Sequence, residues 1–287
     1  MSSPDRSWLP EEFDTRHVDT NGTRLAVAVG GAGQPLVLLH GWPQTSRAWR
    51  HVMAALAQRF TVVAPDLRGT GASDLAEDGY GKLNQAEDMR GVLAALDLTG
   101  PAVVVGHDIG AMVAIAWAAA HPEDLSAVVL LDALQPGFGL EEAMDVAKGG
   151  MWHFGFFMAP GLPEMLFDGH ELEFVTAAFT AMSNPGTFDQ ADLAAYADAY
   201  TGRDRLRGGF EHYRTLLRDG EDNRGLLARG TLPMPVLVVN SGAHRRVEAD
   251  PLRPHVKQLT ALAAPTGHFI AEEDPAWLLS TLKDFLG

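Results

Sequence analysis

Short apolar runs recur along the chain, and stretches with helical character separate them. Each run is uniformly apolar rather than alternating, which is typical of strands in a parallel sheet that is buried on both faces. Two shorter strands precede them over residues 16–29 and flank Asn21-Gly22, a dipeptide that favours the tight turns of β-hairpins. The pattern predicts a mostly parallel central sheet with helices on both faces. The predicted apolar strands are residues 36–39, 61–64, 102–105, 127–131 and 236–239.

The segment between the last two of these strands has no clear strand signal. It is rich in Phe, Met and short helical patterns. We interpret residues 136–230 as a helical cap inserted into the sheet domain, so that the core consists of residues 1–135 and 231–287. One core with an insertion also suits a length of 287 residues better than two independent halves.

The composition narrows the class of protein. Acidic side chains outnumber basic ones by 37 to 22, and the net charge of -15 argues against a nucleic acid or an anionic membrane as the partner. The chain has no cysteine, which excludes disulfides, thiolate metal sites and a cysteine nucleophile. It starts without a signal-peptide pattern and has no apolar run near the roughly 20 residues that a membrane-spanning helix needs. We expect a soluble cytoplasmic protein.

The strongest chemical signal is the segment 102–111, AVVVGHDIGA, in which an apolar strand runs through G-x-D-x-G into an alanine-rich helix. In many hydrolases this sharp turn has the form G-x-S-x-G and holds a nucleophilic serine above the sheet. Asp108 occupies the serine position here, with Gly106 and Gly110 as the small flanking residues. A carboxylate there can displace a leaving group from a saturated carbon and form an ester. The alternative is that Asp108 only caps the following helix, for which Asp is a favoured residue.

Polar segments follow the other predicted strands as well. Because ligands of such sheets lie beyond the carboxyl ends of the strands, these segments are candidates for a site. They are HGWP at 40–43, DLRGTGASD at 66–74 and Asp132 directly after the strand before the cap. A further candidate, TGHF at 266–269, lies close to the C-terminus.

Together these segments resemble the α/β-hydrolase fold, and HGWP, DLRGTGASD and GHDIGA are similar to the epoxide hydrolase family, with haloalkane and haloacetate dehalogenases as relatives. The resemblance covers nearly the whole chain, and the order nucleophile, acid, histidine is the one found in this fold. It implies that Asp108 is the nucleophile. It also implies that His268 is the base, which deprotonates the water that hydrolyses the Asp108 ester.

The acid that orients His268 has two candidate places. Many relatives have it after the strand that follows the cap, where this chain has no carboxylate until Glu248 and Asp250. Asp132 instead follows the strand before the cap, where some dehalogenases and some bacterial epoxide hydrolases have this acid. We therefore assign the acid to Asp132 and expect Glu248 and Asp250 to be surface residues.

The resemblance also implies groups that stabilise developing charge. The backbone N–H groups of Trp42 and Ile109 are the expected oxyanion donors, with a cis peptide before Pro43 that aims the first of them. Epoxide hydrolases commonly protonate the departing oxygen with two cap tyrosines, and the matching segments here contain His153 and Tyr213. A histidine donor should titrate near neutral pH, whereas a tyrosine should not. The alternative for His153 is ordinary packing inside the cap.

These residues predict an epoxide hydrolase that forms a diol, acts on a small neutral apolar substrate and needs no cofactor or metal. The first alternative is a haloalkane or haloacetate dehalogenase with the same triad. Haloacetate enzymes hold the substrate carboxylate with arginines where this chain has Ile109 and Met112, and haloalkane enzymes prefer a tryptophan donor in place of Ile109. The second alternative is a non-catalytic binder of an apolar ligand, although a binder has no need of Asp108, Asp132 and His268 together. The sequence leaves the oligomeric state open, a homodimer included.

Overall fold

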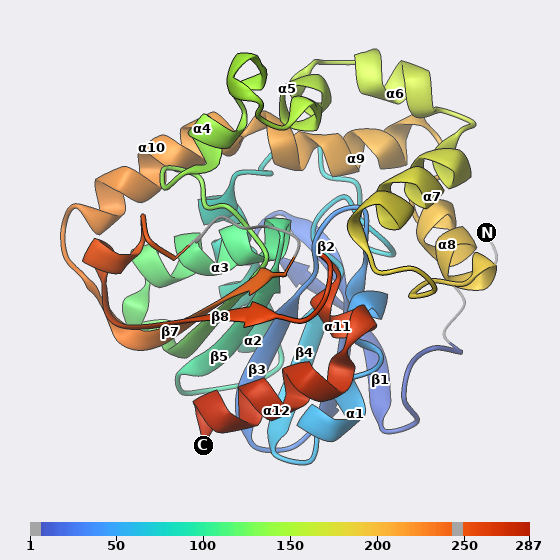
Figure 1. Ribbon diagram of the computed structural model, residues 1–287. Coiled ribbons are helices and arrows are strands. Elements are labelled where there is room, and N and C mark those ends of the chain that lie inside the picture. Colours follow the sequence, from blue (N-terminus) through green and yellow to red (C-terminus); the bar gives the residue numbers. More distant parts are fainter. Residues whose placement is uncertain (1–6, 243–248) are drawn as a thin grey trace.

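The computed structural model describes residues 7–242 and 249–287, which form an eight-stranded sheet flanked by helices (Figure 1). The strand order is β1-β2-β4-β3-β5-β6-β7-β8. β1 and β2 pair antiparallel, β2 is also antiparallel to β4, and β3 to β8 run parallel. The predicted, mostly parallel sheet is therefore confirmed. The strands are β1 (Phe13–Thr20), β2 (Thr23–Gly31), β3 (Gln34–Leu39), β4 (Phe60–Pro65), β5 (Ala102–His107), β6 (Leu125–Leu131), β7 (Leu232–Ser241) and β8 (Val256–Ala264).

The apolar runs form interior strands because helices cover both faces of the sheet. Successive side chains of a strand point to opposite faces, so Leu38 lies in the core with α12 (Pro275–Leu286) and Leu39 lies in the core with α3 (Ile109–Ala120). Uniform apolarity is the pattern that such double burial requires. The remaining core helices are α1 (Met53–Leu56), α2 (Lys82–Ala95) and α11 (Ile270–Glu273).

The two edges of the sheet differ from its centre. β1 and β2 form the predicted hairpin, and Asn21 and Gly22 have φ angles of 41° and 74°, in the left-handed region that its turn requires. β8 was not predicted from the sequence. Only its end residues Val256 and Ala264 are buried, so this edge strand lacks a uniform apolar run. Its carboxyl end leads into the segment that contains His268.

The helices α4 to α10 follow β6 and precede β7, and they cover the edge of the sheet at which the parallel strands end (Figure 1). We call them the cap helices. They lie within residues 136–230, and the domain boundaries at those positions remain a prediction. The cap helices are α4 (Leu140–Ala143), α5 (Trp152–Met158), α6 (Leu162–Phe167), α7 (Glu171–Met182), α8 (Gln190–Asp198), α9 (Arg203–Arg214) and α10 (Leu216–Leu227).

A buried lysine joins the core to the cap helices. Lys82 begins α2, and its ammonium group donates to the His212 carbonyl oxygen at 2.6 Å, Thr215 Oγ1 at 3.1 Å and Asp219 Oδ2 at 3.2 Å. A fully buried charge is costly unless it is paired and hydrogen-bonded, as it is here. These contacts fix the corner between α9 and α10, next to Tyr213.

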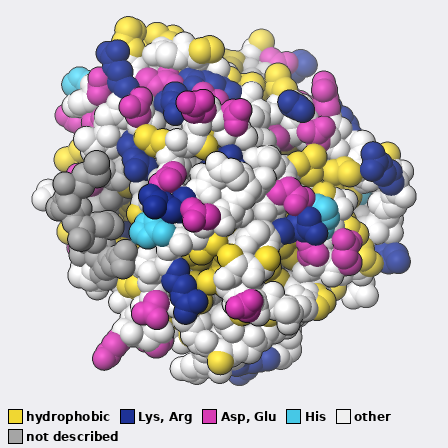
Figure 2. All heavy atoms as spheres, turned by 180° about the vertical axis from the view of Figure 1, so that it is seen from behind, with side chains coloured by type: hydrophobic (Ala, Val, Ile, Leu, Met, Phe, Trp, Pro, Cys, Tyr) yellow, Lys and Arg dark blue, Asp and Glu magenta, His cyan; other side chains and the backbone are white. Residues whose placement is uncertain are grey.

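The net charge of -15 is not gathered into one patch on the face shown in Figure 2, where acidic and basic side chains are intermixed. Among the residues that the structure describes, no helix combines the length and apolarity needed to cross a bilayer.

Candidate active site

β5 and α3 meet in a sharp turn with Asp108 at its tip. The φ angle of Asp108 is 48°, in the left-handed region that residues other than glycine rarely adopt. The chain segments approach closely here, because a Cβ atom on Gly106 would lie 2.4 Å from the Gly110 carbonyl oxygen. A Cβ atom on Gly110 would lie 2.2 Å from the carbonyl oxygen of Leu39. Both motif glycines are therefore needed for the strand and helix to pass each other.

The Asp108 carboxylate faces the cavity and contacts the turn after β3. Its Oδ2 accepts a hydrogen bond from the Trp42 N–H at 2.9 Å, and the Trp42–Pro43 peptide is cis, as expected. The side chain makes no capping hydrogen bond to α3, so nothing supports its interpretation as a simple helix cap. Burial raises the pKa of Asp108, whereas His268 and the N–H groups of Trp42 and Ile109 favour its ionised form.

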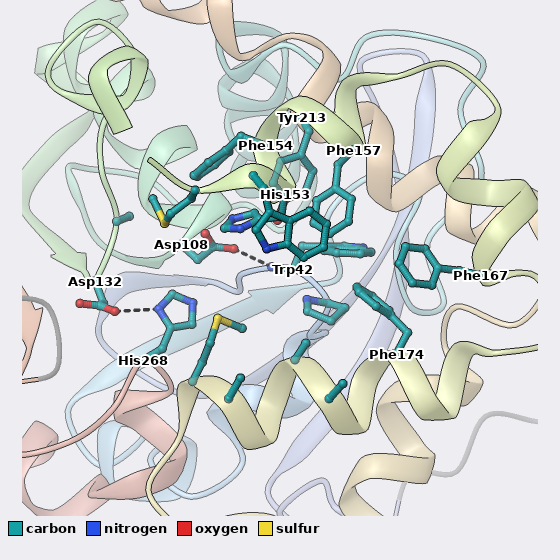
Figure 3. A pocket seen from close by; sticks show the side chains of 18 of the residues that line it. Trp42, Asp108, Asp132, His153, Phe154, Phe157, Phe167, Phe174, Tyr213 and His268 are labelled. Atoms are coloured by element: carbon teal, nitrogen blue, oxygen red, sulfur yellow. Dashed lines mark hydrogen bonds and ion pairs between the residues drawn. The ribbon is translucent and has the colours of Figure 1, made fainter. Parts of the chain in front are cut away.

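The structure brings Asp132 and His268 together from the ends of β6 and β8. His268 Nδ1 lies 2.7 Å from Asp132 Oδ2, and Figure 3 shows this pair beside Asp108. The other oxygen of Asp132 accepts the Ser241 N–H at 2.5 Å, so both carboxylate oxygens have partners. Of the two rival acids, Asp250 is exposed at the surface, and Glu248 lies outside the described residues.

Two further histidines near the site hold the loops in place. His40 Nε2 accepts the Leu67 N–H at 3.0 Å, and His107 Nε2 lies 2.9 Å from the carbonyl oxygen of His268. Burial lowers the pKa of His107 to about 3, so this ring is neutral at pH 7 and donates to that carbonyl group. These contacts give both histidines a structural role.

A cavity of about 710 Å³ lies between the sheet edge and the cap helices. Small-molecule sites typically have about 300–1,000 Å³. Aromatic and aliphatic side chains line most of it, and no Lys or Arg side chain contributes within residues 7–242 and 249–287. Exposed Glu173 and His170 are also among its lining residues. The groups that could carry chemistry are Asp108, Asp132, His153, Tyr213 and His268.

His153 on α5 and Tyr213 on α9 line the cavity from the cap helices (Figure 3). The Tyr213 ring packs edge-on against Trp42, with 5.6 Å between centroids. Burial raises the pKa of Tyr213 well above its ordinary value, so the phenol keeps its proton. Burial also lowers the pKa of His153 to about 4, with nearby His268 acting in the same direction. The expectation that this histidine titrates near neutrality is therefore wrong, because the buried site disfavours the imidazolium ion.

The contribution of α7 to the cavity could not be predicted from a sequence motif. Phe174, Ala177 and Ala181 follow helical spacing and lie on the face of α7 that lines the site. Figure 3 shows this helix along one side of the cavity. The signal was present as small and aromatic residues three and four positions apart, but no motif marks it.

The chain resembles known proteins over nearly its whole length. Residues 34–158 match the family model described as alpha/beta hydrolase fold. The soluble epoxide hydrolase of Corynebacterium sp. (strain C12) is 32% identical over 286 residues, covering 92% of this chain and 94% of that protein. The fluoroacetate dehalogenase of Burkholderia sp. is 29% identical over 291 residues, covering 96% and 94%. The crystal structure of Cfl2 from Burkholderia cenocepacia has a TM-score of 0.88 at 34% identity, covering 99% and 98% of the two chains.

Proposed function

The chain belongs to the epoxide hydrolase family of the α/β-hydrolase fold, and we propose that it opens an epoxide to a vicinal diol through an ester on Asp108. One observation carries the proposal. A half-buried aspartate at the turn after β5 lies beside a His268–Asp132 pair, in a cavity that is also lined by two proton-bearing groups from the cap helices. The cytoplasmic location expected from the sequence remains a prediction.

In the first step Asp108 attacks a carbon of the epoxide ring. The Trp42 N–H holds Oδ2, which leaves Oδ1 as the attacking oxygen. A bond forms between Oδ1 and the carbon while the carbon–oxygen bond of the ring breaks, and the freed oxygen takes up the negative charge. His153 and Tyr213 both carry a hydrogen-bonding proton at neutral pH. They stabilise this oxygen, and Tyr213 supplies its proton.

In the second step His268 removes a proton from water, and the hydroxide attacks the carbonyl carbon of the ester. The N–H groups of Trp42 and Ile109 stabilise the oxyanion that forms. Collapse of this intermediate breaks the bond between the carbonyl carbon and Oδ1, and the departing diol oxygen takes the proton from His268. Asp108 is left as a carboxylic acid, whose proton replaces the one given up in the first step. One water has then been added to one epoxide.

The lining of the cavity favours a neutral apolar substrate over a haloacetate. An anionic substrate would lose its hydration without gaining a countercharge, because no described Lys or Arg side chain lines the cavity and Glu173 adds negative charge. Ile109 and Met112 stand where a haloacetate enzyme needs arginines. A haloalkane is also disfavoured, because haloalkane enzymes prefer a tryptophan donor next to the nucleophile and the side chain of Ile109 cannot donate a hydrogen bond to a halide.

An isotope experiment tests the covalent step directly. With excess enzyme in H₂¹⁸O, the diol of the first turnover should be unlabelled, because its new oxygen comes from Asp108, and Asp108 should gain the label. His268→Gln should form the ester but not hydrolyse it, so the protein mass should increase by one substrate mass. Labelled diol from a single turnover, with no adduct in His268→Gln, would show that water attacks the epoxide first.

The substrate class has a separate test. Neutral epoxides should be hydrolysed, whereas fluoroacetate and chloroacetate should release essentially no halide. Halide release at a rate comparable with diol formation would assign the site to a dehalogenase instead.

A further inference from the structure

Three consecutive backbone N–H groups surround the base, and each has a partner. Gly267 donates to Glu273 Oε2 at 2.8 Å, and Phe269 donates to Glu273 Oε1 at 3.0 Å. Between them, the His268 N–H donates to the carbonyl oxygen of Met182 at 2.8 Å, at the last residue of α7. The loop of the catalytic base is therefore bound by one carboxylate and by one cap helix.

The same carboxylate also binds the cap directly. Asn184, two residues beyond α7, donates its N–H to Glu273 Oε2 at 2.9 Å. The two segments are in close contact, since a Cβ atom on Gly267 would lie 2.4 Å from the Met182 carbonyl oxygen. Phe269 stacks on Phe179 of α7 with 4.4 Å between ring centroids and 24° between planes.

We propose that Glu273 is a positioning residue, which holds His268 at its place next to Asp132 and links the base to the α7 wall of the substrate cavity. The two carboxylate oxygens of Glu273 accept hydrogen bonds from three backbone N–H groups, those of Asn184, Gly267 and Phe269. A glutamine could satisfy only part of this set, because its amide nitrogen would face backbone donors. The inference rests on the proposed two-step mechanism.

Loosening the loop that contains His268 should affect only one of the two chemical steps, the hydrolysis of the ester. Asp108 is fixed independently, by the turn between β5 and α3 and by the Trp42 N–H. His268 transfers protons only during ester hydrolysis, first from the water and then to the departing diol oxygen. Loss of the Glu273 contacts should therefore slow ester hydrolysis and leave the attack of Asp108 on the epoxide unchanged.

Glu273→Gln tests this separation. Displacing a catalytic group by about 1 Å can cost on the order of 10²-fold in rate, and we expect ester hydrolysis to slow by that order. Because hydrolysis then limits turnover, kcat and KM should decrease in proportion and kcat/KM should stay at the wild-type value. The alkylated protein should accumulate in the steady state, visible as a mass increase on Asp108.

Asp274→Asn is the matched control. Asp274 is adjacent to Glu273, but its Oδ1 accepts the Trp277 N–H at 2.9 Å at the start of α12, and asparagine retains an acceptor there. This variant should behave as wild type. A decrease of kcat in Glu273→Gln at unchanged KM, or a decrease of kcat/KM without an adduct, would reduce Glu273 to a purely structural role. If His268→Gln forms the adduct and Glu273→Gln does not, only this inference fails, whereas the absence of an adduct in both overturns the proposed function.

Discussion

Asp108 and Asp132 both have positive φ angles, 48° and 43°, which residues other than glycine seldom adopt. Each such residue costs about 1–3 kcal/mol and persists only where the surrounding structure enforces it. Both directly follow a buried parallel strand, so the sharp turn directs each carboxylate towards the cavity instead of into the sheet. Of the four described residues other than glycine with a positive φ angle, two are the carboxylates that the proposed chemistry uses, and Asn21 and Asp97 are the others.

Asp132→Asn should reduce turnover strongly without unfolding the protein. The amide oxygen of asparagine can still accept the Ser241 N–H, but its nitrogen would face His268 Nδ1 and favour the wrong tautomer of the base. Loss of the orienting acid in a serine triad costs about 10⁴-fold in kcat, and we expect a decrease of at least about 10²-fold here. Steady-state diol formation measures it.

Asp250→Asn is the control for the choice of acid, because this carboxylate is exposed and lies apart from the His268–Asp132 contact. It should leave turnover unchanged. A large loss in Asp250→Asn and a small one in Asp132→Asn would move the orienting acid to the strand after the cap.

At the residue scale, the sequence motifs predicted which residues form the site, but they did not predict the protonation states of those residues. Asp108 and Asp132 could be nominated because each follows a predicted strand, and such strand ends meet at one edge of the sheet. His268 follows β8, which was not predicted, so the family resemblance nominated it. The protonation state of His153 could not be predicted, because burial of this side chain lowers its pKa. That burial results from the packing of the cap helices, which no sequence pattern reveals.

At the element scale, the sequence predicted the strands that are buried on both faces, but it did not predict the edge strand β8 or the role of α7. The interior strands β3 to β7 each contain a continuous apolar run, and the hairpin has a turn dipeptide, so both could be predicted. β8 and α7 present mixed sequences, because one is an edge strand and the other lines an open cavity. Their functions, to deliver His268 and to form a wall of the site, arise only from tertiary contacts.

The alanine face of α7 should set the length of substrate that the site accepts. Ala177 and Ala181 leave space along one wall of the cavity. Each buried methylene contributes about 0.8 kcal/mol, or roughly fourfold in affinity, so kcat/KM should rise along a series of terminal epoxides of increasing chain length. Ala177→Leu and Ala181→Leu should suppress this rise for long chains and leave 1,2-epoxybutane almost unaffected.

Ala94→Leu on the exposed surface of α2 controls for a general effect of leucine on a helix. It should leave the whole substrate series unchanged. Equal loss for short and long epoxides in the α7 variants would show that this face does not contact the substrate chain.

At the scale of the whole molecule, the site depends on histidines that the fold keeps neutral. Burial lowers the pKa of His107 to about 3 and that of His153 to about 4, against an ordinary value near 6.5. At pH values between these lowered pKa values and 6.5, the two histidines are protonated in the unfolded chain but neutral in the folded chain. The free energy of unfolding therefore decreases as the pH falls through this window. Asp108 acts in the opposite sense, because its raised pKa lets the folded state bind a proton first.

Comparing variants isolates the contribution of His107 to the pH dependence of stability. The remaining titratable groups are common to all variants, so their effect cancels in the comparison. In this pH range, each histidine that stays neutral in the folded state lowers the free energy of unfolding by up to about 1.4 kcal/mol per pH unit. His107 is the more deeply buried of the two histidines. Urea unfolding of His107→Gln should show lower stability than wild type at pH 7, because the contacts with Gln44 and His268 change, but a shallower loss between pH 6.5 and pH 4.5. His17→Gln, at an exposed position of β1, should keep the wild-type slope. A slope in His107→Gln equal to that of wild type would mean that this histidine does not contribute to the acid sensitivity of the fold.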